Sequence, residues 1–266
     1  MLTRFDHAVI AVRDLEAAIG AFRRLGFDVL PGGNHPGMGT ANAVVRFGLD
    51  YIELLSVVDR AAGERAGPVI QTLIDYLERR EGFVGYGITS DDVDADADRI
   101  RSAGLEVLMM PLSRVHPDGT TLRWLLAVPG RMPWLRPWPF LIQCDQVDDV
   151  RLRLEPPGEH PNGATHCRRA VVAAGEPQAA ESLLAGQIGL RKVGRTFEVD
   201  DFTIQVTEGV SEPGLVELHI GVRDLPAASR CLPAGAVVQA SEGELRIDPV
   251  ASAGAPLVLV SGEGAG

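Results

Sequence analysis

The chain has 266 residues, of which 45% are hydrophobic, so it is long enough for one large or two small domains with a hydrophobic core. Its formal net charge of −11 argues against nucleic-acid binding, because a phosphate-binding surface needs clustered Lys and Arg. The three cysteines are widely spaced, which argues against a disulfide or zinc framework and fits a reducing compartment.

The first residues place Arg4, Asp6 and His7 where a signal peptide needs apolar side chains. No apolar run approaches the roughly 18 residues that a membrane-spanning helix needs. We therefore expect a cytoplasmic protein that binds neither membranes nor nucleic acids.

Residues 6–57 predict one unit of a strand, a helix and three further strands. His7 to Val12 is short and β-branched, as strands are. Asp14 is a helix N-cap residue, the apolar residues that follow have helical spacing, and Gly26 ends the pattern. The three later strands are expected at residues 27–30, 43–47 and 51–57.

The same unit recurs three times downstream. Asp92 to Gly104 repeats the spacing from Asp14 to Gly26, and Val222-Arg-Asp-Leu225 repeats Val12-Arg-Asp-Leu15 letter for letter. A third helix is expected over residues 176–189, before the fourth unit begins near Val216. Repetition of a strand, a capped helix and a closing glycine is stronger support for a fold than any single element.

These units predict an α+β fold in which four βαβββ modules pair into two curved mixed sheets, each with a concave cleft. Residues 1–146 would hold two modules and an inserted amphipathic helix over residues 65–80. Residues 147–159, rich in turn formers, would be a linker. Residues 160–262 would hold the second pair of modules.

The βαβββ repeat, with His7 on the first strand and Glu53 on the fourth, resembles the vicinal oxygen chelate superfamily, which includes glyoxalase I and the extradiol dioxygenases. The loop His35-Pro-Gly-Met-Gly-Thr40-Ala-Asn42 and the strand Tyr51-Ile-Glu53-Leu are similar to its glyoxalase-like domain subfamily. The resemblance implies the fold. It leaves the activity open, because the superfamily hosts isomerases, epimerases, dioxygenases and non-catalytic binding proteins.

The resemblance also implies a divalent metal, such as Zn, Ni, Mn or Fe, held by His7 and Glu53 and chelating two adjacent substrate oxygens. Read from the residues alone, Glu53 could face solvent, and His7 could be a core histidine bonded to the backbone. Two of the four usual ligands are missing from the second unit, where Gly85 and either Ile142 or Gln143 correspond to His7 and Glu53. Glu217 of the fourth unit corresponds to His7 and could be a third ligand.

The Gly-rich loop is expected at the mouth of the cleft, where His35, Thr40, Asn42 and the nearby Tyr51 would bind a ligand. The alternative is a structured turn in which Thr40 and Asn42 satisfy the loop backbone.

Two functions follow from this pattern. The first is a metal-dependent lyase, isomerase or dioxygenase that acts on a small oxygenated molecule, with Glu53 as the proton-transferring residue. The second is a binding protein that sequesters a small molecule in the same cleft without turnover. A homodimer fits either function.

Overall fold

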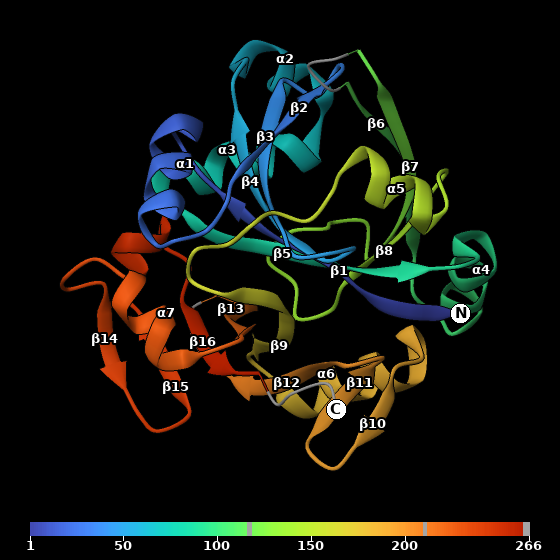
Figure 1. The fold of residues 1–266 in the computed structure, drawn as a ribbon. Helices are drawn as coiled ribbons and strands as arrows, with labels where there is room; N and C mark the ends of the chain where they lie inside the picture. Colours follow the sequence, from blue (N-terminus) through green and yellow to red (C-terminus); the bar gives the residue numbers. More distant parts are fainter. Residues whose placement is uncertain (116–118, 210–211, 263–266) are drawn as a thin grey trace.

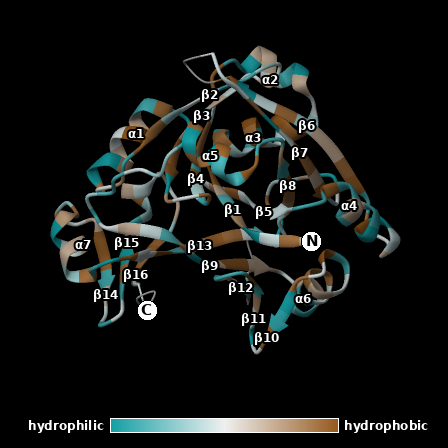
Figure 2. Ribbon diagram, turned by 45° about the vertical axis from the view of Figure 1, so that its right-hand side comes forward, coloured by the Kyte–Doolittle hydropathy of each residue, from teal (hydrophilic) through white to brown (hydrophobic). Residues whose placement is uncertain are grey.

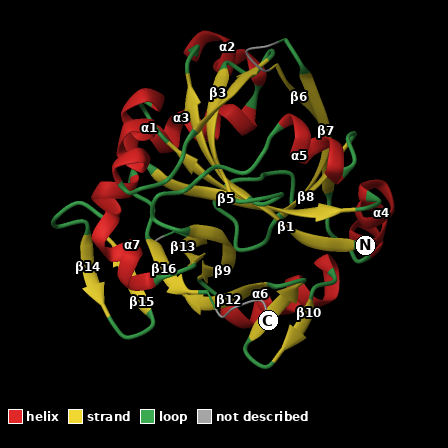
Figure 3. Ribbon diagram, viewed as in Figure 1, coloured by secondary structure: helices red, strands yellow, loops and turns green. Residues whose placement is uncertain are grey.

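The strands of residues 1–115, 119–209 and 212–262, which the computed structural model describes, form two eight-stranded sheets (Figures 1 and 3). The first sheet contains β1 (Leu2–Ala11), β2 (Leu30–His35), β3 (Thr40–Arg46), β4 (Tyr51–Val57), β5 (Gly82–Ser90), β6 (Val107–Val115), β7 (Thr121–Pro129) and β8 (Phe140–Cys144). It closes into a barrel in the order β1-β4-β3-β2-β6-β7-β8-β5.

The second sheet is open. It contains β9 (Ala164–Ala174), β10 (Arg191–Val193), β11 (Thr196–Val199), β12 (Phe202–Glu208), β13 (Gly214–Val222), β14 (Val237–Ala240), β15 (Glu244–Ile247) and β16 (Leu257–Ser261). Its strand order is β10-β11-β12-β9-β13-β16-β15-β14. These two sheets and their helices confirm the predicted α+β class.

The helices lie on the outside of the sheets and at the ends of the barrel (Figure 3). They are α1 (Leu15–Arg24), α2 (Arg60–Ala66), α3 (Pro68–Arg79), α4 (Val93–Ser102), α5 (Asp148–Leu154), α6 (Pro177–Leu183) and α7 (Leu225–Cys231), with a π-helical turn η1 (Leu184–Ile188) and a 3-10 turn η2 (Pro249–Ser252). None of the helices in the described residues is long and apolar enough to cross a membrane.

The helix N-caps expected from the sequence are present. The side chains of Asp14, Asp92 and Asp224 accept the backbone N–H groups three residues ahead, at 2.9–3.0 Å. These bonds satisfy N–H groups that a helix leaves unpaired at its first turn. Gly26 follows α1 with φ of 77°, a left-handed conformation that favours glycine.

Three features differ from the sequence expectation. The inserted helix is two helices, because Gly67 (φ 102°) separates α2 from α3. The first sheet is a closed barrel rather than an incomplete one, although among the described residues β2 and β6 pair only at Asn34 and Val115. The expected linker contains α5, and the side chain of Arg151 in this helix is buried.

The side chains of β1 serve two hydrophobic cores. Ala8 and Ile10 belong to a core that continues into the second sheet, whereas Val9 and Ala11 pack inside the barrel with residues of α3. Hydrophobic residues also gather on β9 and β13, the strands at the centre of the second sheet (Figure 2). Alternate side chains of a strand point to opposite faces, so β1 joins the two layers.

A β-bulge at Asp6 sets which residues face the barrel interior. Phe5 pairs with Ile88 and His7 with Gly87, so Asp6 is an extra residue with no partner on β5. The bulge shifts the alternation by one residue. Phe5 therefore points out of the barrel and stacks on Phe202 of the second sheet with ring centroids 4.0 Å apart, whereas His7 points into the barrel.

The contact between Phe5 and Phe202 predicts a large stability effect. Replacing Phe202 by Ala removes a buried ring between the two sheets and should lower the free energy of unfolding by about 3–5 kcal/mol, measured by urea titration. Val250→Ala changes a side chain that is 88% exposed and is the control, expected within about 0.5 kcal/mol of wild type. Equal effects of the two changes would contradict this packing.

His160 predicts a pH dependence of stability. Its Nδ1 accepts the Asp28 N–H at 3.0 Å and its Nε2 donates to the Arg46 carbonyl at 3.0 Å, so the native contacts need the neutral ring. Burial lowers the pKa of His160 in the folded protein, against an opposing effect of the Arg46 carbonyl. The unfolded chain then binds a proton more readily, and stability falls as pH drops below about 6.5.

The matched variant is His160→Asn, which keeps one donor and one acceptor and removes the titration. The difference in unfolding free energy between wild type and variant should shrink from pH 7.5 to pH 5. A constant difference across that range would show that His160 does not titrate on unfolding.

Candidate functional site

A cavity of about 90 Å³ lies inside the barrel, enough for several waters or a small organic molecule. Strands β1 to β4 contribute six polar side chains. Strands β6 to β8 contribute mostly apolar ones, together with Arg114 and Arg123, and Arg151 and Glu155 also line the cavity. The polar side chains from β1 to β4 are His7, His35, Thr40, Asn42, Tyr51 and Glu53. The facing wall includes Met110, Leu112, Trp124, Leu126, Phe140 and Ile142.

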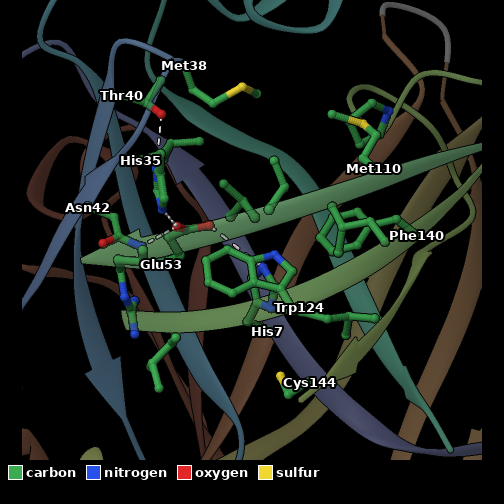
Figure 4. A pocket seen from close by; sticks show the side chains of 18 of the residues that line it. His7, His35, Met38, Thr40, Asn42, Glu53, Met110, Trp124, Phe140 and Cys144 are labelled. Carbon is green, nitrogen blue, oxygen red and sulfur yellow. Dashed lines mark hydrogen bonds and ion pairs between the residues drawn. The ribbon is translucent and has the colours of Figure 1, made fainter. Parts of the chain in front are cut away.

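Strand alternation brings the polar side chains together (Figure 4). Tyr51, Glu53 and Leu55 of β4 line the cavity, while Ile52 and Leu54 pack in the outer core. Thr40 and Asn42 of β3 point into the cavity in the same way. The structure therefore brings His7, His35, Thr40, Asn42, Tyr51 and Glu53 to one cavity.

Three of these side chains each have a dedicated polar partner. His7 Nδ1 bonds Asp6 Oδ1 at 2.7 Å, and His35 Nδ1 bonds Thr40 Oγ1 at 2.9 Å. Asn42 Nδ2 donates to Glu53 Oε1. Such bonds fix the orientation of each ring and of the carboxylate.

With their Nδ1 atoms occupied, both imidazoles direct Nε2 toward Glu53. The distance from His7 Nε2 to Glu53 Oε2 is 3.7 Å, and from His35 Nε2 to Glu53 Oε1 it is 4.0 Å. These distances are too long for hydrogen bonds. The three side chains thus surround a small space that can receive a further group.

Asp6 is fully buried and ionised. Burial alone would raise the pKa of its carboxyl group, but Arg151, His7 and Arg4 together hold that pKa well below its usual value. An ionised carboxylate only accepts hydrogen bonds. His7 therefore donates from Nδ1, and its Nε2 faces the cavity.

His35 is held neutral by its surroundings. Burial lowers the pKa of His35, which the nearby Glu53 partly opposes. A neutral imidazole with one nitrogen fixed by Thr40 can offer the other nitrogen as a metal ligand or proton acceptor.

Tyr51 supports the site through its ring. It stacks on His7 with centroids 4.6 Å apart and planes 12° apart, and the Arg46 guanidinium lies 4.5 Å from its centroid on the barrel wall. Burial raises the pKa of Tyr51, so the phenol stays protonated. Its position beside His7 limits the tilt of that imidazole.

A buried ionic cluster at the same end of the cavity was missed in the sequence. Glu155 accepts hydrogen bonds from Arg46 at 2.6 Å and from Arg114, and Arg151 donates to Asp6 at 3.3 Å. The sequence contains one sign of this cluster, because Arg46 interrupts the apolar run of β3. In the structure this arginine is fully buried. A charge inside such a run needs a partner.

Glu217 does not join His7 and Glu53. It lies on β13 of the second sheet, where it bonds His219 Nε2 at 2.7 Å and accepts from Arg246, and it does not line the cavity. The structure therefore does not bring the expected third ligand, Glu217, to this cavity, because the fourth unit belongs to a different sheet from the first.

Within the residues that the structure describes, the second unit contributes no replacement for the missing ligands. Ile142 lines the cavity as an apolar side chain, whereas Gln143 caps α4 by accepting the Val93 N–H at 2.9 Å. A side chain at Gly85 would meet the Pro133 carbonyl and the Trp134 ring. Among His, Cys, Asp and Glu side chains, β5 and β8 add only Cys144 to the cavity lining, and burial raises the pKa of its thiol to about 11.

The family assignment agrees with this architecture. The glyoxalase-like domain family matches residues 5–188, which is more than half of the chain. The chain belongs to this family. Among curated proteins, none matches.

Solved structures share the fold across nearly the whole chain. A hypothetical protein from Staphylococcus aureus has a TM-score of 0.76 at 16% identity, covering 98% of this chain and 100% of that one. A mutant 4-hydroxymandelate synthase from Streptomyces coelicolor has a TM-score of 0.60 at 14% identity, covering 100% and 94%. A Mn(II)-bound glyoxalase from Novosphingobium aromaticivorans has a TM-score of 0.57 at 12% identity, covering 98% and 82%. At these identities the likeness establishes the glyoxalase-like fold.

The ionic cluster predicts a large effect of one substitution. Glu155→Gln removes the carboxylate that faces two buried guanidinium groups and should lower the free energy of unfolding by about 3–5 kcal/mol. Glu106→Gln, in an exposed ion pair with Arg131, is the control and should change it by less than about 1 kcal/mol. Similar small losses in both variants, measured in urea, would show that the buried cluster does not stabilise the fold.

Proposed function

We propose that the chain is a divalent-metal-dependent enzyme of the lyase, isomerase or dioxygenase type that acts on a small oxygenated molecule, with His7, His35 and Glu53 as the metal ligands. The observation that carries this proposal is the approach of two anchored imidazole Nε2 atoms to the two oxygens of one carboxylate. Two imidazoles and a carboxylate suit Fe(II), Mn(II), Ni(II) or Zn(II) and leave coordination positions open for a substrate.

The distances fit a metal after a small closure. Two metal–ligand bonds of about 2.0–2.2 Å span at most about 4.4 Å when the ligands lie opposite each other and less when they are adjacent, so the 3.7 Å and 4.0 Å separations need only a small closure. In the described residues, no three His, Cys, Asp or Glu side chains already form a closed ligand cluster. We therefore expect the ion to draw the three side chains inward.

Each part of the cavity has a role in this proposal. A bound divalent ion would act as a Lewis acid on substrate oxygens. Asn42 holds Glu53 Oε1, and Oε2, the oxygen nearest His7, would accept a substrate proton while it is not bound to the ion. Trp124 and Phe140 on the facing wall exclude water and contact the apolar part of the substrate.

Binding without turnover is the second candidate. It is favoured by the wall from β5 to β8, which supplies Phe140 and Ile142 and whose Cys144 thiol stays protonated. A cavity with ligands on one side only could hold a small apolar molecule without a metal.

We also infer that four copies of one βαβββ module, paired within residues 1–146 and 160–262, built the fold. In each group of strand, helix and three strands, the first strand pairs in parallel with the last, as in β1 with β4 and β9 with β12. The pairs β5 with β8 and β13 with β16 follow the same rule. The cytoplasmic location and a homodimer stay predictions.

Metal uptake tests the proposed function. Purified protein incubated with Mn(II), Fe(II), Ni(II) or Zn(II) and then desalted should retain about one ion per chain; Mn(II) comes first because a similar structure is Mn(II)-bound. Glu53→Gln and His35→Gln should weaken uptake at least about tenfold, because each removes a ligand while keeping similar volume. Glu217→Gln is the control, since Glu217 lies outside the cavity.

Elemental analysis and thermal melts give the outcome. The enzyme proposal is supported if wild type and Glu217→Gln retain metal while Glu53→Gln and His35→Gln lose it. No metal in any protein, with a melting temperature raised by a small apolar molecule, would replace it with the binding protein.

A further inference from the structure

Helix α5 is attached to the barrel by charged side chains. Its residues belong to neither hydrophobic core, and Leu154 at its end is 40% exposed. By contrast, Arg151 and the following Glu155 are almost completely buried and line the cavity. In Figure 1 the helix lies beside the barrel near β8.

These two side chains lie four residues apart and so project from one face of the helix. Their charges are opposite, and each meets its complement on the barrel. Arg151 reaches Asp6 of β1, and Glu155 reaches Arg46 of β3 and Arg114 of β6. Removing the partner of a buried charge strongly destabilises the folded protein. Both contacts therefore restrict the position of α5 on the barrel.

The carboxylate of Asp6 divides its two oxygens between different tasks. Oδ2 accepts from Arg4 at 3.2 Å, Thr89 at 3.0 Å and Arg151 at 3.3 Å, which come from β1, β5 and α5. Oδ1 faces His7 Nδ1 at 2.7 Å. Three donors around one oxygen fix the plane of the carboxylate and therefore the direction in which Oδ1 points.

We propose that Arg151 is a positioning residue that, by fixing the Asp6 carboxylate, holds the His7 imidazole with Nε2 toward the cavity. This inference rests on the proposed function only in assigning His7 to the site. It makes α5 part of the site, although its segment has the sequence character of a linker. The second contact of α5, through Glu155, keeps Arg151 within reach of Asp6.

The bulge at Asp6 gives this arrangement its geometric basis. Asp6 has no partner on β5, so its side chain can lie beside that of His7 instead of on the opposite face of the strand. A carboxylate released from Arg151 could turn about its χ angles and leave His7 Nδ1 without an acceptor.

The protonated ring nitrogen of His7 in metal-free protein tests the inference directly. Long-range proton–nitrogen NMR spectra of histidine-labelled protein separate the two neutral tautomers, and loss of a signal in His7→Gln assigns the ring. We expect wild type to show the proton on Nδ1. In Arg151→Gln this signal should give way to a mixture of both tautomers.

Four variants complete the test. Asp6→Asn should produce the same mixture, because an amide can also donate to Nδ1. Arg151→Lys, which keeps the charge, should restore most of the wild-type spectrum. Arg153→Gln changes an exposed residue of the same helix and should resemble wild type. Thr89→Val removes one donor to Oδ2 without removing a charge and should give a smaller shift in the same direction, which keeps the test decisive if Arg151→Gln fails to fold.

The metal affinity provides a second readout. The Mn(II) dissociation constant of Arg151→Gln should rise about tenfold, as for other losses of support to a ligand. A lower melting temperature with unchanged tautomer and affinity would make Arg151 purely structural and overturn the inference. Tautomer changes in a protein that takes up no metal would uphold the positioning role and reject the metal-dependent function.

Discussion

The extra residue at Asp6 is the constraint on which the site depends. Without the bulge, the alternation that sends Phe5 outward would also send His7 outward, and Asp6 would face the cavity. With it, Phe5 joins the core between the sheets while His7 enters the barrel. The same residue then supplies the carboxylate that bonds His7. One local irregularity thus connects the packing of the two layers to the chemistry of the cavity.

The interior of the barrel holds charges in a protein of net charge −11, and each buried carboxylate has its own donors. Glu53 accepts from Asn42, Asp6 accepts from four groups that include Arg151 and His7, and Glu155 accepts from two arginines. In a low-dielectric space such donors replace the hydration that ionised groups lose. This compensation explains how a mostly apolar cavity can keep a charged end that is fixed in position.

The sequence predicted what local patterns determine. Helical spacing and Asp caps predicted α1, α4 and α7. The loop around His35 predicted several of the residues that line the cavity. The sequence did not predict the bulge or the role of α5, because these depend on pairing between distant segments. The partners Arg46 and Glu155 are 109 residues apart, and Asp6 and Arg151 are 145 apart. The turn-forming residues around α5 favoured a linker, and the buried face of this helix carries charged side chains instead of the apolar ones that usually indicate a helix.

The position of Glu217 shows why sequence equivalence alone does not place a residue at the cavity. Its alignment with His7 holds along the chain, but the second sheet stays open while the first closes. Glu217 is therefore only partly buried, and its charge is balanced by Arg246 and a hydrogen bond from His219. Closure is what removes water and strengthens electrostatic interactions in the barrel. Equivalent strands can thus place acidic residues in different surroundings, and the cavity that contains Glu53 lies inside the closed sheet.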